Sequence, residues 1–129
     1  VFGWKKDSKI NLEKSLKVGD EISGHFVYGH VDSTIELIKV IKFPNSWEYE
    51  FSLSSFKDNV DVKKFIVEKG SLAINGISLT IANIFDRSFN VSVIPHTFNN
   101  TNLSTLREGD SVNIEFDPLA RYIVRKYDR

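Results

Sequence analysis

Residues 68–82 have the sequence EKGSLAINGISLTIA, and this stretch decides the fold. Its Asn75-Gly76 pair is a strong β-hairpin signal, because both residue types tolerate the positive φ angles that a two-residue hairpin turn requires. The residues on either side alternate between polar and apolar, as strands with one buried face do. The stretch therefore predicts two short antiparallel strands, 71–74 and 77–81, joined by a tight turn.

The second predicted strand carries two hydroxyl groups on one face. Ile77, Leu79 and Ile81 point one way, and Ser78 and Thr80 point the other way. A solvent-exposed surface is the common interpretation of such a face. Hydroxyls beside a glycine turn and a lysine also suit a polar ligand pocket, and the strand alone does not decide between the two.

The composition excludes several classes of protein. The 129 residues suffice for one domain, and 17 basic against 17 acidic residues argue against binding nucleic acid or anionic membranes by bulk charge. Without cysteine there is no disulfide or thiolate metal site, and His, Asp and Glu show no metal-ligand spacing, so we expect no metal. No apolar run approaches about 18 residues, and no signal peptide is visible, so a cytoplasmic location is expected.

Further patterns along the chain predict the remaining elements. Alternating or β-branched segments predict strands at 9–13, within 21–43, and at 47–53, 89–94 and 111–116. One or two helical turns are expected at 62–68 with Asp61 as N-cap, and polar loops at 54–61 and 96–104. Asp117-Pro118 opens a final helix. The prediction is an all-β fold: a six-stranded antiparallel Greek-key β-barrel with a short internal helix and a C-terminal helix.

An internal echo links the two ends of the chain. Residues 9–13 (KINLE) and 111–115 (SVNIE) share the pattern apolar-Asn-apolar-Glu. If the echo is a repeat, the first residues are the end of a preceding barrel that is missing here. The final helix has an apolar stripe that must be buried somewhere, which suggests association. The expected organisation is a tail at 1–16, a barrel at 17–117 and an oligomerisation helix at 118–129.

Four motifs stand in a fixed order: residues 24–32 (GHFVYGHVD), 68–80, 94–97 (IPHT) and 109–115 (GDSVNIE). Together they resemble the second lumazine-binding barrel of the riboflavin synthase family, whose members carry two tandem barrels. The resemblance implies dismutation of two molecules of 6,7-dimethyl-8-ribityllumazine to riboflavin and 5-amino-6-ribitylamino-pyrimidinedione, without metal or cofactor. It also implies a homotrimer, with the active site between barrels of neighbouring subunits.

The resemblance further implies a set of substrate-binding residues. They are Gly29, His30, Val31, Lys69, Ser78, Leu79, Thr80, Ser92, Val93, Ile94, Pro95, His96 and Thr97. His30 and Ser78 are the candidate catalytic residues, since histidine suits proton transfer near neutral pH. The plainer interpretation of His30 is a structural histidine at a strand bend, and that of Lys69 is an exposed turn lysine. His25 is expected to be structural.

Three functions are weighed. The first is the C-terminal half of riboflavin synthase, a transferase, which alone should be weakly active or inactive because each of two lumazines needs its own barrel. The second is a non-catalytic lumazine- or flavin-binding barrel, in which pocket residues tend to be lost, whereas here they look intact. The third, an oligonucleotide-binding barrel, needs a basic face with exposed aromatic side chains, and zero net charge argues against it.

Overall fold

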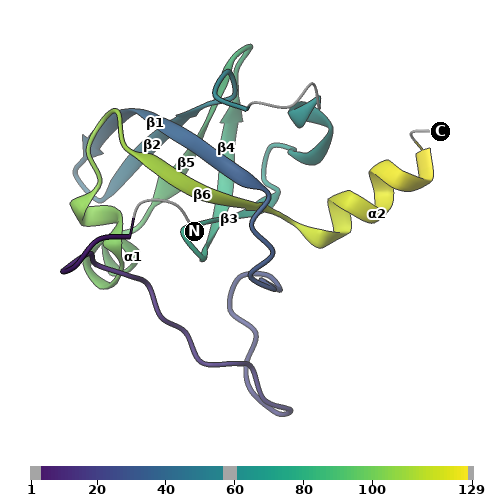
Figure 1. The fold of residues 1–129 in the computed structure, drawn as a ribbon, viewed down its shortest axis with the longest axis horizontal. Coiled ribbons are helices and arrows are strands. Elements are labelled where there is room, and N and C mark those ends of the chain that lie inside the picture. Colours follow the sequence, from purple (N-terminus) through teal and green to yellow (C-terminus); the bar gives the residue numbers. More distant parts are fainter. Residues whose placement is uncertain (1–3, 57–60, 128–129) are drawn as a thin grey trace.

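The structure is a computed structural model that describes residues 4–56 and 61–127. Antiparallel strands close into a barrel in the order β1-β2-β5-β4-β3-β6, and β6 pairs with β1 (Figure 1). The strands are β1 (Ser33–Phe43), β2 (Ser46–Ser52), β3 (Ser71–Ile74), β4 (Ile77–Ile84), β5 (Ser88–Val93) and β6 (Ser111–Phe116). The pairs β2–β5 and β3–β6 join strands that are not consecutive, as Greek-key connections do. The predicted six-stranded barrel is confirmed.

Short helices connect the strands or follow them. They are the 3-10 helices η1 (Val62–Phe65) and η2 (Asn102–Thr105) and the α-helices α1 (Pro95–Asn100) and α2 (Pro118–Tyr127). No helix in residues 4–56 and 61–127 has the length and apolar character needed to cross a membrane. The predicted internal and C-terminal helices are therefore both present, together with α1 and η2, which the sequence did not indicate.

The hairpin at Asn75-Gly76 has the predicted turn and register. Asn75 has φ 48° and Gly76 has φ 78°, so both occupy the left-handed region that a two-residue turn needs. Leu79 is 7% exposed and points into the barrel, whereas Thr80 is exposed on the outer face. The predicted alternation along β4 is confirmed.

The core fills the barrel with side chains from all its strands. Phe51 and Phe89 lie with ring centroids 5.7 Å apart, and Leu103 of η2 closes one end, fully buried. The Tyr49 hydroxyl donates a hydrogen bond to the Leu103 carbonyl at 2.9 Å. Burial raises the pKa of Tyr49 to about 12, so the phenol stays protonated as a donor at ordinary pH.

Residues 4–32 contain no strand, so the strand expected at 9–13 is wrong, and the strand expected within 21–43 begins at Ser33. Gly24 and Gly29 have φ +86° and +79° and bend the chain twice just before β1, which interrupts any ladder there. Near the start, Asn11 donates from its side chain to the Asn75 carbonyl and to Asn102 Oδ1, both at 2.9 Å. Side-chain hydrogen bonds to a turn and a loop thus hold this segment instead of a strand ladder.

The loop expected at 96–104 is helical, because Pro95 starts α1 and polar side chains bond back to its carbonyls. Asn100 Nδ2 donates to the His96 carbonyl and Thr101 Oγ1 to the Thr97 carbonyl, each at 2.7 Å. The helical turn expected at 62–68 is the shorter η1, and the Asp61 side chain makes no capping hydrogen bond. The loop expected at 54–61 lies partly outside the described residues, as do the ends of the predicted tail and final helix.

The helix α2 extends away from the barrel (Figure 1). Asp117 Oδ1 accepts from the Leu119 N–H at 3.1 Å, as expected of an N-cap, and Arg121 forms an ion pair with Asp32 at the start of β1. Among the described elements α2 has its main contacts with η1. Its apolar stripe is between 58% and 78% exposed and consists of Leu119, Tyr122, Ile123 and Tyr127.

We predict that Tyr49→Phe lowers the free energy of unfolding by about 1–3 kcal/mol, because the buried Leu103 carbonyl loses its donor. Tyr127→Phe, at a residue 77% exposed, is the control and should change it by less than about 0.5 kcal/mol. Urea titration measures both.

The pKa of Tyr49 is raised from 10.0 to about 12, so the stability difference between the wild type and Tyr49→Phe should depend on pH. It should be constant below pH 10 and should fall as pH rises toward 12. Equal stability of both variants at neutral pH would contradict the account.

Candidate ligand-binding site

Two of the sequence motifs meet on the outer face of β4 and β5. Ile81 lies opposite Val91 in this antiparallel pair, so Thr80 and Ser92 both stand directly beyond the last residue pair at this end of the two strands. Both of these side chains are exposed. The β4–β5 edge, meaning the outer face formed by Ser78, Thr80, Ser92 and Ile94, therefore presents hydroxyls together with the apolar side chain of Ile94.

Leu79 and Val93 lie on the same strands and point inward. They are 7% and 0% exposed and belong to the core. Their backbone groups remain at the edge, but their side chains do not form an outer wall. Ile94, which is 57% exposed, and the adjoining Pro95 of α1 supply the apolar surface of the edge instead.

Lys69 approaches β4 from the segment before β3. Its backbone N–H donates to the Ile81 carbonyl at 2.8 Å, and Ile81 N–H donates to the Gly70 carbonyl at 2.9 Å. Lys69 has φ 66° and an exposed side chain. These backbone bonds place Lys69 next to β4 on the side that faces β3, and its exposed side chain is the cation that the sequence assigned to a ligand contact.

His96 and Thr97 lie on α1, directly after the edge. His96 is exposed, and its ring Nδ1 is 3.4 Å from Asn100 Nδ2. Thr97 is half-buried, and its carbonyl accepts from Thr101. Both follow Pro95, which comes directly after Ile94 of the β4–β5 edge, so α1 borders the site at this end.

Gly29, His30 and Val31 lie on a different part of the barrel surface from the β4–β5 edge. The next residue, Asp32, donates its N–H to the Ile114 carbonyl at 2.8 Å, which places this segment beside β6. The His30 ring stacks on Tyr28 with centroids 6.3 Å apart. The strands β6 and β3 lie between these residues and β4. The structure thus places residue 69 beside β4 and residues 92–97 at the end of the neighbouring strand β5 and on α1, and it leaves 29–31 two strands away from β4.

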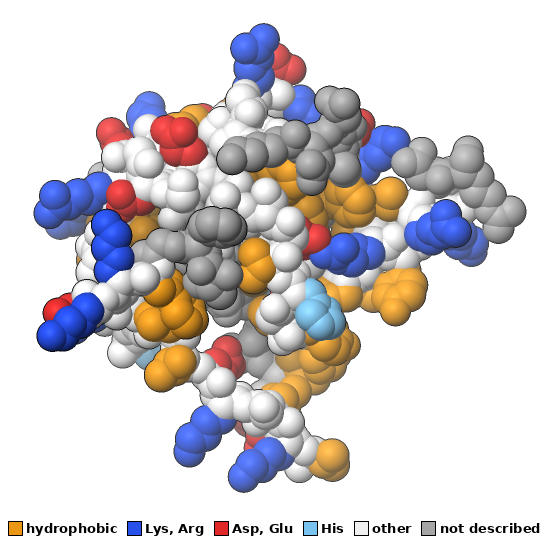
Figure 2. Space-filling view, viewed as in Figure 1, with side chains coloured by type: hydrophobic (Ala, Val, Ile, Leu, Met, Phe, Trp, Pro, Cys, Tyr) orange, Lys and Arg blue, Asp and Glu red, His pale blue; other side chains and the backbone are white. Residues whose placement is uncertain are grey.

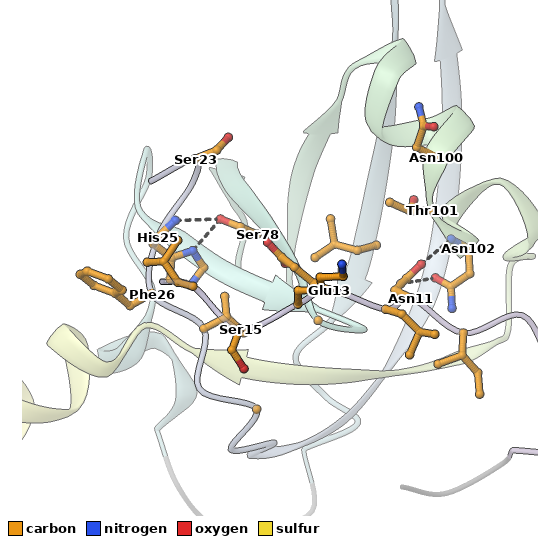
Figure 3. Close-up of a pocket in the computed structure, with 18 of the residues that line it drawn as sticks. Asn11, Glu13, Ser15, Ser23, His25, Phe26, Ser78, Asn100, Thr101 and Asn102 are labelled. Atoms are coloured by element: carbon orange, nitrogen blue, oxygen red, sulfur yellow. Dashed lines mark hydrogen bonds between the residues drawn. The ribbon is translucent and has the colours of Figure 1, made fainter. Parts of the chain in front are cut away.

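A cavity of about 970 Å³ opens between residues 9–29 and the barrel (Figure 3). The hairpin residues 76–78 and residues 99–105, from the end of α1 through η2, form its other walls. Of the predicted site residues, Gly29 and Ser78 line it, while His30, Lys69 and Thr80 lie outside its lining. Ser78 is therefore the residue shared between this cavity and the β4–β5 edge.

Residues 24–28 form a strap that crosses the barrel face at this cavity. His25 donates its backbone N–H to Ser78 Oγ at 3.2 Å, and its ring Nδ1 lies 2.6 Å from the same oxygen (Figure 3). At the other end of the strap, the Tyr28 N–H donates to Glu115 Oε2 at 3.1 Å. His25, expected to be structural, is thus in direct contact with a candidate catalytic residue.

The sequence did contain a signal for these missed residues. Gly24-His25 is the same dipeptide as Gly29-His30, and Glu115 ends the echoed motif SVNIE. Within residues 4–56 and 61–127, no group of three or more His, Cys, Asp or Glu side chains is arranged to hold a metal ion. Figure 2 shows Lys, Arg, Asp and Glu side chains interspersed over the visible face, without a continuous basic surface.

The family model of the lumazine binding domain matches residues 28–117. The chain belongs to the lumazine-binding domain family. Its relatives include the riboflavin synthase of Bacillus amyloliquefaciens, 41% identical over 123 residues that make up 95% of this chain and 55% of that protein. The riboflavin synthase of Brucella abortus is 39% identical over 97% of this chain and 59% of its own length. The chain spans about half the length of the curated relatives it matches.

Solved structures of LumP share the fold of this lumazine-binding domain. LumP complexed with 6,7-dimethyl-8-(1'-D-ribityl) lumazine aligns with a TM-score of 0.67 and 20% identity, over 81% of this chain and 53% of that one. LumP complexed with riboflavin aligns with a TM-score of 0.64 and 21% identity, over 76% of this chain and 50% of that one. The resemblance that the sequence motifs indicated, to one lumazine-binding half of riboflavin synthase, is confirmed at the level of family and fold.

We predict that Gly24→Ala displaces the strap of this lumazine-binding domain. A Cβ on Gly24 would lie 2.8 Å from Ser78 Cβ and closer still to Ser78 Oγ. Gly19→Ala is a matched control, because Gly19 also has positive φ (+94°) but a Cβ added there would meet no atom within 4 Å. Both variants bear a backbone cost of about 1–2 kcal/mol.

The clash adds to that cost in Gly24→Ala alone. We expect its free energy of unfolding to be lower than that of Gly19→Ala, and the amide resonances of residues 25–28 to shift. The account is contradicted if urea titration finds the two variants equally stable and the strap resonances unchanged.

Proposed function

We propose that this barrel is the C-terminal lumazine-binding half of a riboflavin synthase, and that it holds one molecule of 6,7-dimethyl-8-ribityllumazine on its β4–β5 edge. The observation that carries the proposal is that Thr80 and Ser92 are both exposed on the outer face of neighbouring strands, in a chain 41% identical to a riboflavin synthase. An ordinary solvent-exposed strand face does not require two hydroxyls together with a lysine, Lys69, and an exposed apolar side chain, Ile94.

The chemistry of the edge suits a planar, hydrogen-bonding heterocycle. Thr80 and Ser92, with the adjacent backbone groups, are placed to bond to the edge of the ring. Ile94 provides an apolar surface for its face, and Lys69 provides a cation for a ring carbonyl or the ribityl chain. Val31 and His30 are assigned to the neighbouring ligand position, because they lie two strands away beside β6.

The proposed reaction transfers a four-carbon unit from one lumazine to the other and yields riboflavin and 5-amino-6-ribitylamino-pyrimidinedione. It is redox-neutral, so it requires no oxidant or reductant. Two rings must be held face to face, and proximity supplies a large part of the rate. His30 and Ser78 are assigned to proton transfer at the acidic methyl group and the ring. A single barrel leaves the second ring unpositioned.

Residues 1–16 are proposed to be the end of a preceding barrel. Leu12 is 92% exposed, whereas its counterpart in the echo, Ile114, is fully buried. Glu13 is exposed, whereas its counterpart Glu115 is 5% exposed. These side chains have the pattern of a barrel strand without the barrel that would cover them, which supports the assignment.

The alternative is a lumazine- or flavin-carrying barrel without catalysis. It shares the fold and predicts the same ligand contacts at the β4–β5 edge. It differs in predicting no turnover when a second barrel is supplied. Binding and turnover therefore need separate measurements.

We predict that the chain binds 6,7-dimethyl-8-ribityllumazine and that Thr80→Val weakens binding roughly fivefold, since one hydrogen bond contributes about 1 kcal/mol. Thr34→Val, an isosteric change on β1 away from the edge, is the control and should leave the affinity unchanged. Ligand fluorescence measures both. Binding of neither lumazine nor riboflavin by the wild type would contradict the proposed function.

Turnover should require a second barrel. The isolated chain is expected to convert 6,7-dimethyl-8-ribityllumazine slowly or not at all, and a separately made preceding barrel should restore the rate. Steady-state formation of riboflavin is the measurement. Full-rate turnover by the chain alone would contradict the need for a second barrel, and binding without rescue would favour the carrier.

We also propose that α2 mediates association, as part of a homotrimer. Ile123→Glu should abolish self-association, because it places a charge in the exposed stripe of α2, where Ile123 is 58% exposed. Val18→Glu, at a fully exposed apolar residue outside α2, is the control. Sedimentation velocity measures the mass of each. A wild type that stays monomeric at all concentrations would contradict the role of α2.

A further inference from the structure

Two buried polar atoms have no hydrogen-bond partner among the described residues: His25 Nε2 and Glu115 Oε1. Glu115 as a whole is 5% exposed. Leaving a buried polar atom unpaired is costly, most of all on a charged group. One atom belongs to a carboxylate, which accepts, and the other to an imidazole, which donates in one of its two neutral forms.

The sheet register places Glu115 in one row with Ser78, the residue that His25 contacts. Ala73 of β3 lies opposite Glu115 of β6 on one side and opposite Ser78 of β4 on the other. Side chains opposite each other in a sheet lie on the same face, so all three point outward. The methyl group of Ala73 leaves room between its two larger neighbours.

The strap runs along this row. His25 contacts Ser78 at one end, and three residues later Tyr28 contacts Glu115 at the other end. Ala73 is 1% exposed although it lies on the outer face, so the strap covers it. The imidazole is bonded to Ser78 through Nδ1, which leaves Nε2 for a partner other than Ser78.

We propose that Glu115 is a positioning residue for His25 and, through His25, for Ser78. Its carboxylate accepts the Nε2 proton, either directly after a side-chain rotation or through one bridging water molecule. This holds the neutral imidazole in the Nε2–H tautomer and leaves Nδ1 as an acceptor. The Ser78 hydroxyl, 2.6 Å from Nδ1, then donates its proton to that nitrogen.

The arrangement determines what Ser78 offers to a ligand. Its oxygen accepts the His25 backbone N–H at 3.2 Å and gives its own proton to Nδ1, so a lone pair remains toward the cavity. Ser78 is then an acceptor for an N–H or O–H of the ligand, not a donor to a carbonyl. This last step rests on the proposed function, whereas the position of the His25 proton does not.

The test is the tautomer of His25, measured by two-bond ¹H–¹⁵N NMR of the full chain at mildly alkaline pH, with His25→Gln to assign its signals among the three histidines. In the wild type we expect a protonated Nε2 and an unprotonated Nδ1. Glu115→Gln should raise the fraction of the Nδ1–H form, because the amide keeps its oxygen on the Tyr28 N–H and turns its NH₂ group toward Nε2. Glu13→Gln, at an exposed glutamate of the same cavity, should leave the tautomer unchanged.

Ser78→Ala keeps the test decisive if Glu115→Gln does not fold. It should retain the Nε2–H form, because Glu115 and not Ser78 fixes the proton. An Nδ1–H tautomer in the wild type, or one that Glu115→Gln leaves unchanged, would overturn the proposal. Lumazine titration of the same samples separates the role of Glu115 from the proposed function. The expected tautomers without lumazine binding would support the role of Glu115 and contradict the proposed function. Lumazine binding without the expected tautomers would contradict the role of Glu115 alone.

Discussion

The rest of the structure depends on the turn at Asn75-Gly76. Its two positive φ angles fix the register of β3 against β4, and a shift of one residue would turn Leu79 and Ile81 out of the core. Asn75 also joins this hairpin to β6, since its N–H donates to the Asn113 carbonyl and its Oδ1 accepts the Asn113 N–H, both at 2.9 Å. Its own carbonyl accepts from Asn11, so one residue ties the hairpin, the closing strand and the N-terminal segment together.

That register has a direct functional consequence. With Leu79 inside, Ser78 and Thr80 must be outside, and with Val93 inside, Ser92 and Ile94 must be outside. The core therefore determines which groups a ligand can meet on the β4–β5 edge. The same register lines up Ser78, Ala73 and Glu115 and leaves a space over the alanine that the strap fills. Gly24 allows the strap to come this close, because any side chain there would meet Ser78.

Local patterns predicted the parts of the fold that depend on local chemistry. The Asn-Gly turn, the alternation along β4 and the Asp117-Pro118 start of α2 follow from residue types within a few positions. The strand expected at 9–13 is absent because alternation indicates that a segment can form a strand but not which strand it pairs with. Here Asn11 bonds to the side chain of Asn102 and to the turn at Asn75 instead. The helix α1 is an exception: its contacts run from Asn100 and Thr101 to carbonyls four residues earlier, but Asn- and Thr-rich segments favour loops, so its composition pointed away from a helix.

The site, like the fold, was predictable only where it depends on local residue patterns. The hydroxyl face of β4 was visible in the sequence, whereas its place next to β5, the strand of Ser92, depends on a strand order that no local pattern gives. The contact between His25 and Ser78 joins residues 53 positions apart and depends on two glycine bends, so the repeated Gly-His dipeptide marked His25 without showing what it contacts.

The central claim is that lumazine lies on the β4–β5 edge, and amide chemical-shift mapping of the ¹⁵N-labelled chain with 6,7-dimethyl-8-ribityllumazine tests it most directly. The account predicts that the largest shifts occur at Lys69, Thr80, Ser92 and Ile94. Largest shifts at Asn102 and Ser104, at the far end of the cavity, with Thr80 and Ser92 unchanged, would contradict it.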